Sequence, residues 1–243
     1  MTRVAIIIPA RYGAQRFPGK PLADLAGKPM VAHVVERARR AAGVDEVAVA
    51  TDDQRIARAA EEAGARAVVT GPAETGTDRV AQAARALTPR PGIVVNLQGD
   101  EPLIEPEALE RLVAAMRRGG AEMATLARPL EAEELARPQV VKVVTDLAGD
   151  ALYFSRAGIP HRRAGGVSPL ARAHVGVYAF TAEALERFAA LPPGRLEREE
   201  ALEQLRALEN GIKIRVVETD YRGFGVDTPD DLEKARALLG AGA

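Results

Sequence analysis

The sequence has no cysteine, and aromatic residues make up only 4% of its 243 residues. Without cysteine the chain can form no disulfide framework, no thiolate nucleophile and no cysteine-ligated zinc site. The chain also has no excess of charge of one sign, because 33 basic residues are balanced by 34 acidic ones. A formal net charge of −1 gives no general electrostatic reason to bind nucleic acid or a membrane surface.

Long apolar runs are absent as well. The N-terminal run, residues 4–8, holds five apolar residues before Pro9. A signal peptide needs a longer apolar region, and a membrane helix needs roughly 20 apolar residues. We therefore expect a cytoplasmic protein. A hydrophobic fraction of 47% with 28% charged residues is ordinary for a globular protein and argues against disorder.

The first half of the chain alternates short apolar runs with amphipathic segments. The runs are β-branched and do not alternate with polar residues, so they predict strands that are buried on both faces. The pattern predicts a parallel, doubly wound α/β sheet. The expected strands are 4–8, 47–50, 67–69 and 93–97, and the expected helices are 30–42, a helix capped by 51–53 and stopped by Gly64, 78–87 and 107–117.

The second half has more strands and fewer helices between them. No internal repeat and no linker-like segment interrupts it, so we predict a single domain. The expected strands are 123–127, 140–145, 152–154, 175–180 and 213–218, with a loop at 163–169 and helices at 199–210 and 229–239.

Ligands of an open α/β sheet bind beyond the carboxyl ends of its strands. The segment after the first strand, residues 9–22, contains Arg11, Arg16, Lys20 and two glycines. Glycines let a backbone approach an anion, and clustered cations neutralise one, which predicts a polyphosphate cradle. A solvated basic loop is the alternative interpretation. The segment matches neither a Walker A loop nor a dinucleotide fingerprint, which argues against a dinucleotide-dependent oxidoreductase.

Two acidic turns are candidates for a metal site. Asp100 follows the fourth strand beside a glycine, where a carboxylate can hold a divalent metal against phosphates. Asp227 stands just before a helix N-cap signal, Thr228 with Asp231, and is not needed for the cap. The alternative for both turns is helix capping. Residues 75–79 open a helix, and their hydroxyls could either bind a nucleotide or cap that helix.

These segments together carry a resemblance to a known family. The chain resembles the cytidylyltransferases that activate acidic sugars, and within them the 3-deoxy-manno-octulosonate (Kdo) cytidylyltransferases, over nearly its whole length. The opening segments and QGDEP (98–102) are typical of the superfamily, whereas FSR, GVY and LEQLR separate the Kdo enzymes from CMP-sialate synthetases. The matching segments are 5–12, 16–22, 75–79, 96–102, 153–156, 174–178, 202–206 and 225–229.

The resemblance implies a Rossmannoid, glycosyltransferase-A-like α/β fold. Its mostly parallel sheet is flanked by helices, and a small additional sheet is used for homodimerisation. We divide the single nucleotidyltransferase domain, 1–243, into a nucleotide-binding part (1–120), a sugar-binding and dimerisation part (121–220) and a C-terminal metal turn and helix (221–243).

The resemblance also implies roles for individual residues. Lys20, Asp100 and Asp227 would be catalytic, and the two aspartates would hold Mg²⁺. The nucleotide would contact Ala10, Arg11, Arg16, Lys20, Thr75 and Arg79. The sugar would contact Gln98, Arg156, His174, Tyr178, Glu200 and Gln204.

Sequence patterns alone leave other interpretations open for the sugar-site residues. His174 could be an exposed strand histidine, and Tyr178 could be core packing. Glu197, Glu200 and Glu203 recur every three residues, which by spacing alone is typical of a solvated acidic edge. The chain also departs from the family pattern by having alanine at positions 14 and 173.

The expected reaction is transfer of CMP from CTP to Kdo, giving CMP-Kdo and pyrophosphate for lipopolysaccharide biosynthesis. The alternatives are a cytidylyltransferase for 8-amino-Kdo or sialic acid, and a non-catalytic nucleotide-binding module. We expect CTP and Kdo as small-molecule partners and a homodimer, with neither nucleic acid nor a membrane as a partner.

Overall fold

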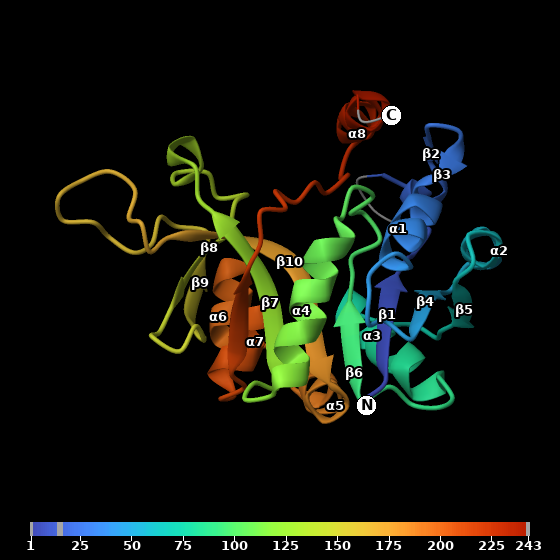
Figure 1. Cartoon of the computed structure of the whole chain (residues 1–243), viewed down its shortest axis with the longest axis horizontal. Coiled ribbons are helices and arrows are strands. Elements are labelled where there is room, and N and C mark those ends of the chain that lie inside the picture. The colour runs from blue at the N-terminus through green and yellow to red at the C-terminus, as the bar shows by residue number, and fades with distance from the viewer. Residues whose placement is uncertain (1, 14–16, 242–243) are drawn as a thin grey trace.

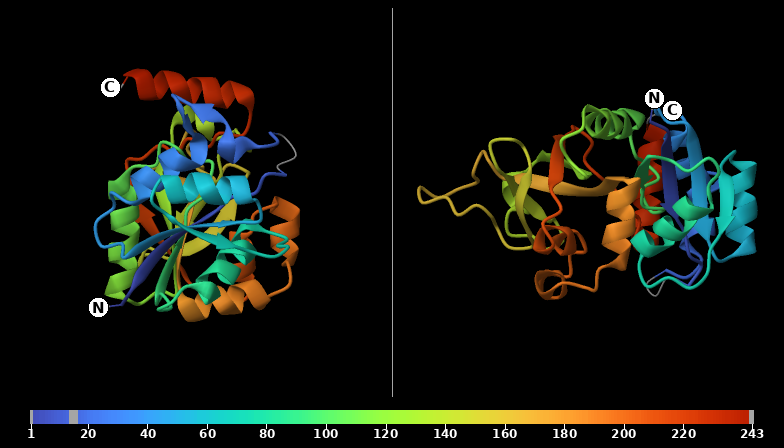
Figure 2. Two further views of the ribbon diagram at one scale, coloured as in Figure 1. Left: turned by 90° about the vertical axis from the view of Figure 1, so that its right-hand side faces the viewer. Right: turned by 90° about the horizontal axis from the view of Figure 1, so that it is seen from below.

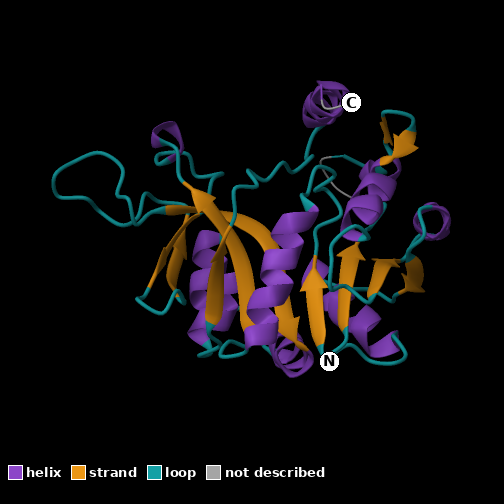
Figure 3. Cartoon of the chain, viewed as in Figure 1, coloured by secondary structure: helices purple, strands orange, loops and turns teal. Residues whose placement is uncertain are grey.

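A computed structural model describes residues 2–13 and 17–241 of the chain. One mixed sheet runs through the middle of the molecule, and helices cover both of its faces (Figures 1 and 3). Its nine strands are β1 (Val4–Pro9), β4 (Glu46–Thr51), β5 (Arg66–Val69), β6 (Ile93–Asn96), β7 (Met123–Pro129), β8 (Lys142–Thr145), β9 (Ala151–Ser155), β10 (Arg172–Thr181) and β11 (Ile214–Glu218). This architecture confirms the predicted α/β class.

The main path through the sheet has the order β11-β7-β10-β6-β1-β4-β5. Strands β1, β4, β5 and β6 pair in parallel, as do β7 and β11, whereas β10 is antiparallel to both of its neighbours β6 and β7. The carboxyl ends of the parallel strands therefore lie at one edge of the sheet, the upper edge in Figure 1. Strands β8 and β9 form an antiparallel ribbon that pairs with the start of β10.

The helices divide between the two faces of the sheet, which Figure 2 shows from two further sides. One core cluster packs α1 (Met30–Ala38), α2 (Gln54–Glu62) and α4 (Pro106–Arg118) against the sheet. The other face is covered by α3 (Gly76–Ala86), α5 (Ala182–Ala190) and α7 (Gln204–Glu209). Strand β1 contributes alternate residues to both clusters, which confirms that it is buried on both faces.

A small cap lies above the carboxyl ends of the strands. It consists of the 3-10 turn η1 (Lys20–Leu22), the two-stranded pair β2 (Asp24–Leu25) and β3 (Lys28–Pro29), and the terminal helix α8 (Pro229–Ala241). Leu25 and Met30 pack against Val226 and Leu232 in a third apolar cluster. The cluster therefore holds the C-terminal segment close to the segment that follows β1.

Several elements differ from the sequence prediction. The helix expected at 199–210 is two short helices, α6 (Arg195–Glu200) and α7, separated by Ala201 at φ 51°. The carboxylate of Glu209 accepts hydrogen bonds from the first amides of α6, so the end of one helix caps the start of the other. Helix α5 was missed, although Thr181 caps it by accepting from the Ala184 amide at 3.1 Å.

Other predictions hold in detail. Asp53 caps α2, as its position after the second strand predicts. Thr228 and Asp231 form a reciprocal pair of hydrogen bonds at the start of α8, with the Asp231 amide 3.2 Å from the threonine hydroxyl. The segment that contains 163–169 has neither helix nor strand, and it projects away from the body between β9 and β10 (Figure 1). Among the described residues, no helix combines the length and apolar character that crossing a membrane requires.

Candidate active site

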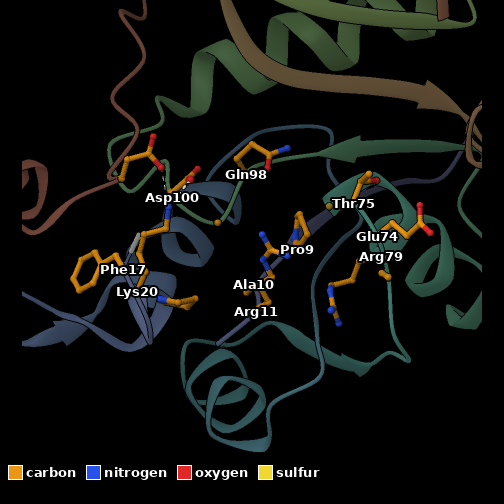
Figure 4. Close-up of a pocket in the computed structure, with 15 residues that line it drawn as sticks. Pro9, Ala10, Arg11, Phe17, Lys20, Glu74, Thr75, Arg79, Gln98 and Asp100 are labelled. Atoms are coloured by element: carbon orange, nitrogen blue, oxygen red, sulfur yellow. Dashed lines mark hydrogen bonds and ion pairs between the residues drawn. The ribbon is translucent and has the colours of Figure 1, made fainter. Parts of the chain in front are cut away.

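The candidate site is a cavity of about 490 Å³ at the carboxyl ends of neighbouring strands β1 and β6 (Figure 4). This is where an open α/β sheet places its ligands. The lining comes from the segment after β1, the start of α3, the turn after β6 and the segment before α8. Its residues are Pro9, Ala10, Arg11, Phe17, Lys20, Pro21, Ala73, Glu74, Thr75, Gly76, Arg79, Gln98, Gly99, Asp100 and Asp227.

Lys20 joins the two aspartates that the sequence singles out. Its ammonium Nζ lies 2.7 Å from Oδ2 of Asp100 and 3.4 Å from Oδ1 of Asp227. The lysine side chain is 14% exposed, and the two aspartates are 31% and 44% exposed. The site therefore keeps two carboxylates close together with a cation between them, while both remain accessible from the cavity.

Two glycines make this approach possible. Gly19 precedes η1 at φ 74°, and its amide donates to the Tyr12 carbonyl at 2.8 Å, which closes the turn that presents Lys20. At Gly99, a Cβ would lie 2.8 Å from the carbonyl oxygen of Pro9. Only glycine therefore lets the Asp100 turn lie so close to the end of β1.

The carboxylates fit a hard divalent cation when a nucleotide supplies further ligands. Mg²⁺ is commonly bound through one or two carboxylates, with phosphate oxygens and water completing its shell. Asp100 and Asp227 offer oxygen donors of this kind at the cavity. Among the described residues, no group of three or more His, Cys, Asp or Glu side chains forms a ready-made metal site. Phosphate oxygens of a nucleotide and water would complete the ligand shell of a cation held here.

The turn before α3 both caps the helix and lines the cavity. The Thr75 hydroxyl accepts from the Asp78 amide at 3.1 Å, and Asp78 accepts from the Thr75 amide at 3.0 Å. Arg79 is only 5% exposed, and its guanidinium donates to Thr70 and, at 2.8 Å, to Asp52. The capping interpretation is therefore correct for Thr75, and Arg79 is a fixed cation in the cavity wall.

Ala10 and Arg11 line the cavity, as the nucleotide-site prediction requires. The Ala10 amide donates to the Ala50 carbonyl at 2.9 Å, so this donor is used within the sheet. Arg11 is exposed. Arg16 and Ala14 lie outside the described residues.

The six sugar-site candidates fall into three groups. Gln98 lines the cavity and donates to Asn96 at 3.2 Å, whereas the other five are not among the lining residues. Tyr178 donates to Oε1 of Gln204 at 3.1 Å, and the His174 ring is 5.5 Å from the Tyr178 ring. This aromatic and amide group lies between β10 and α7.

Arg156 and Glu200 form the third group, at the end of β9. The Glu200 carboxylate accepts from the Ser155 hydroxyl at 2.6 Å and from the Arg156 amide at 2.9 Å. The Arg156 guanidinium donates to backbone carbonyls, including that of Glu200 at 2.6 Å. Glu200 therefore connects α6 to β9 and does not belong to a solvated edge.

Burial sets the protonation of the aromatic group. Because burial disfavours the charged form, the pKa of His174 falls to about 3, and the ring is neutral near pH 7. Its Nε2 lies 2.9 Å from the Thr125 hydroxyl. Burial also raises the pKa of Tyr178 above its usual value. The Nε2 of Gln204 is buried, and it has no hydrogen-bond partner among the described residues, so the group has an unused donor.

Sequence patterns missed the chain of hydrogen bonds that links the cavity to α7. Gln98 donates to Asn96, Asn96 donates to Thr77 at 3.1 Å, and Thr77 donates to Glu203 at 2.6 Å. Burial raises the pKa of Glu203 above its usual range. The three-residue spacing of the glutamates placed Glu203 on a solvated edge. That interpretation is wrong, because the Glu203 carboxylate accepts a hydrogen bond from Thr77 in a distant segment.

Comparison with known proteins identifies the family. The family model described as cytidylyltransferase matches residues 5–214. The chain belongs to the cytidylyltransferase family.

Relatives of this cytidylyltransferase are similar over its whole length. A 3-deoxy-manno-octulosonate cytidylyltransferase of Anaeromyxobacter sp. (strain Fw109-5) is 78% identical and covers 100% of this chain and 99% of its own. One from Nitratidesulfovibrio vulgaris (strain Hildenborough) is 55% identical, covering 96% of this chain and 94% of its own. These matches confirm the resemblance to the Kdo branch of the family.

Solved structures agree with the fold. The structure of a CMP:2-keto-3-deoxy-manno-octonic acid synthetase in complex with CTP is 44% identical, with a TM-score of 0.93 and full coverage of both chains. A 4-diphosphocytidyl-2C-methyl-D-erythritol synthase from Anaerococcus prevotii is 17% identical with a TM-score of 0.66, and it supports the fold alone. It covers 98% of this chain and 99% of its own.

Proposed function

We propose that this cytidylyltransferase transfers CMP from CTP to Kdo, giving CMP-Kdo and pyrophosphate for lipopolysaccharide biosynthesis. The observation that carries the proposal is the meeting of Lys20, Asp100 and Asp227 in one cavity. They come from three segments far apart in the sequence and lie beside Arg11 and Arg79. The names of the relatives supply the nucleotide and the sugar.

In the proposed reaction the anomeric 2-hydroxyl of the sugar attacks the α-phosphorus of CTP in line. A bond forms between the sugar oxygen and phosphorus, the bond to the bridging oxygen breaks, and pyrophosphate leaves as the hydroxyl proton is released. Both reactants are anionic, so their repulsion must be reduced before attack. Arg11 and Lys20 supply positive charge on the nucleotide side, and we assign no side chain as a general base.

We further propose that Asp100 and Asp227 hold Mg²⁺ beside the triphosphate. When bound, the ion would neutralise phosphate charge and lower the pKa of the attacking hydroxyl. Lys20 contacts both carboxylates, so the two groups already face one cation. The fixed Arg79 and the Thr75 turn would orient the cytidine.

The remaining candidates are proposed to receive the acidic sugar. Gln98 faces the cavity, and the unused Gln204 amide donor suits a sugar oxygen. His174 and Tyr178 pack beside that donor, and Arg156 and Glu200 fix the neighbouring end of β9. The division of the domain into nucleotide, sugar and C-terminal parts remains part of this proposal.

We also propose a cytoplasmic homodimer that forms through residues 121–180. Three leucines in this stretch are exposed: Leu147 at 110%, Leu152 at 62% and Leu170 at 71%. They belong to the β8–β9 ribbon or to the segment before β10. The exposure of these three large apolar side chains within one stretch of the chain supports an interface there.

A pyrophosphate-release assay with four nucleotides and a panel of acidic sugars tests the function. We expect release with CTP and Kdo, dependent on magnesium, and much less with sialic acid. The variant Lys20→Met, which removes the ammonium between the aspartates, serves as the matched inactive control. Turnover of 8-amino-Kdo alone would keep the family chemistry but reject Kdo as the substrate. Absence of metal-dependent release with every pair would favour a nucleotide-binding module.

A further inference from the structure

Asp227 is carried by residues 219–228, which we call the strap. The strap follows β11, has neither helix nor strand, and runs over the carboxyl ends of the central strands into α8 (Figure 1). The strap makes no regular ladder of backbone hydrogen bonds, and one local contact at its end is the bond from the Asp227 amide to the Asp231 carboxylate in α8 at 3.3 Å. Contacts with other segments hold the part of the strap that leads to Asp227.

The turn after β6 supplies three such hydrogen bonds. The Oε2 atom of Glu101 accepts from the Tyr221 hydroxyl at 2.5 Å and from the Phe224 amide at 3.0 Å. The Asp100 carbonyl accepts from the Val226 amide at 2.9 Å. Two consecutive residues of the turn, Asp100 and Glu101, thus hold the backbone of the strap at Val226 and Phe224, just before Asp227.

Glu101 is suited to hold the strap and does not contact the substrate cavity. It is absent from the cavity lining, whereas its neighbour Asp100 belongs to it. Its partner Tyr221 is only 4% exposed and packs in the main core cluster. Tyr221 thus anchors the strap in the core, and its hydrogen bond to Glu101 ties this anchor to the turn after β6 that carries Asp100.

Glu101 is a carboxyl group in a place that does not favour one. Burial raises the pKa of Glu101 above its usual value, and the nearby charges of Asp100 and Asp227 act in the same direction. The hydrogen bonds from the Tyr221 hydroxyl and the Phe224 amide oppose this effect. The arrangement is therefore consistent with a carboxylate whose task is to accept both bonds.

We propose that Glu101 is a positioning residue that fixes the strap through Tyr221 and the Phe224 amide. In this way it keeps Asp227 facing Asp100 and Lys20. The consequence for turnover rests on the proposed function, whereas the structural link between Glu101 and the strap does not.

The first test compares magnesium dependence in four variants. Glu101→Ala should raise the magnesium concentration for half-maximal rate about tenfold and lower kcat by about 10- to 100-fold, the range seen when supporting partners of metal ligands are lost. The KM for the sugar should change less than kcat. Glu101→Gln keeps an oxygen that can accept both bonds and should recover most of the rate. Tyr221→Phe loses the bond to Glu101 and the bond from the Phe224 amide to the hydroxyl, but it keeps the bond between Glu101 and that amide, so it should lie between them.

Arg128→Met is the control for a strap contact away from Asp227. Arg128, on β7, donates from Nε to the Arg222 carbonyl at 2.9 Å and also pairs with Glu134 at 2.6 Å, so the variant removes a strap contact together with an ion pair outside the strap. It should leave magnesium dependence near that of the wild type. If Arg128→Met and Glu101→Ala shift it equally, general loosening of the strap is the cause and the proposal fails.

A second readout needs neither metal nor substrate. In Glu101→Ala, hydrogen exchange at the Phe224 and Val226 amides should quicken, while the amides of β7 and β10 keep wild-type protection. Unchanged exchange would overturn the proposal even if activity fell. Should Glu101→Ala not fold, Tyr221→Phe carries the same measurement, with the same outcome overturning it.

A double-mutant cycle separates action through Asp227 from a direct effect. In an Asp227→Asn background, Glu101→Ala should cause little further rise in the magnesium requirement. Full additivity would show that Glu101 does not act through Asp227. If the wild type itself released no pyrophosphate from CTP, the proposed function would fail, while the exchange measurement would still decide the structural link.

Discussion

Replacing Asp100 with asparagine separates a role in turnover from a role in stability. The substitution keeps the shape of the side chain but removes the charge that pairs with Lys20 and suits a hard cation. If Asp100 holds magnesium, the rate should fall about 100-fold or more, as when a preorganised electrostatic partner of the transition state is removed. The magnesium concentration for half-maximal rate should also rise.

The structure predicts a small effect of the same substitution on folding. The Lys20–Asp100 pair is partly open to solvent, with side chains 14% and 31% exposed. Lys20 also keeps Asp227 within 3.4 Å after the change. An ion pair of this kind contributes about 1 kcal/mol or less to stability. For a chain of this length, that loss lowers the melting temperature by about 2–4 °C.

The assay measures pyrophosphate release against magnesium concentration beside thermal melting, for Asp100→Asn and Asp227→Asn. Glu186→Gln is the control, because it removes one carboxylate from an exposed ion pair with Arg85 at 2.6 Å, outside the cavity. The control should keep wild-type rate and magnesium dependence. Wild-type magnesium dependence in either aspartate variant would refute the reasoning for that residue. A large fall in melting temperature would show that its role is structural.

Three further predictions concern the base, pH and assembly. CTP should be used more than about tenfold better than UTP, ATP or GTP, because the opening segment and the turn at 75–79 that line the cavity match the cytidylyltransferase family; equal turnover with UTP would contradict the assignment. The His174 pKa of about 3 lies below its unfolded value near 6.5, so the unfolded state binds more protons between these pH values. Stability should therefore fall, by up to about 1.4 kcal/mol per pH unit, as pH drops through this window; His174→Gln should reduce that dependence in denaturant titrations. Leu152→Lys should turn the dimer into a folded monomer by light scattering, and a monomeric wild type would defeat the interface proposal.

The sequence was most informative where structure is local. Runs such as 4–8 and 93–97 predicted strands because their apolar residues have no polar face, and the capping residue Asp53 predicted the start of α2. The helix at 199–210 was misread because the three-residue spacing of Glu197, Glu200 and Glu203 continues across the break at Ala201. A continuous helical period does not reveal a single residue that adopts a left-handed conformation.

The candidate site was recovered where its residues follow strands. Lys20 and Asp100 stand after β1 and β6, and the parallel pairing of those strands brings them together. Placing Asp227 beside them required the family resemblance, since its own turn reads as helix capping. The role of Glu101 could not be predicted in this way, because the local sequence around it is the same whether its side chain caps a helix or holds a distant segment.

The contacts that escaped prediction share one physical cause. The Glu101–Phe224 and Thr77–Glu203 hydrogen bonds join segments more than one hundred residues apart, so no local period or spacing contains them. Each has at least one buried or partly buried carboxylate that would be costly to leave unpaired. Once the topology brings the segments together, the free-energy cost of a buried carboxylate without a hydrogen-bond partner favours these bonds. The fold therefore determines which acidic residues are structural links, and exposure to the cavity separates Asp100 and Asp227 from them.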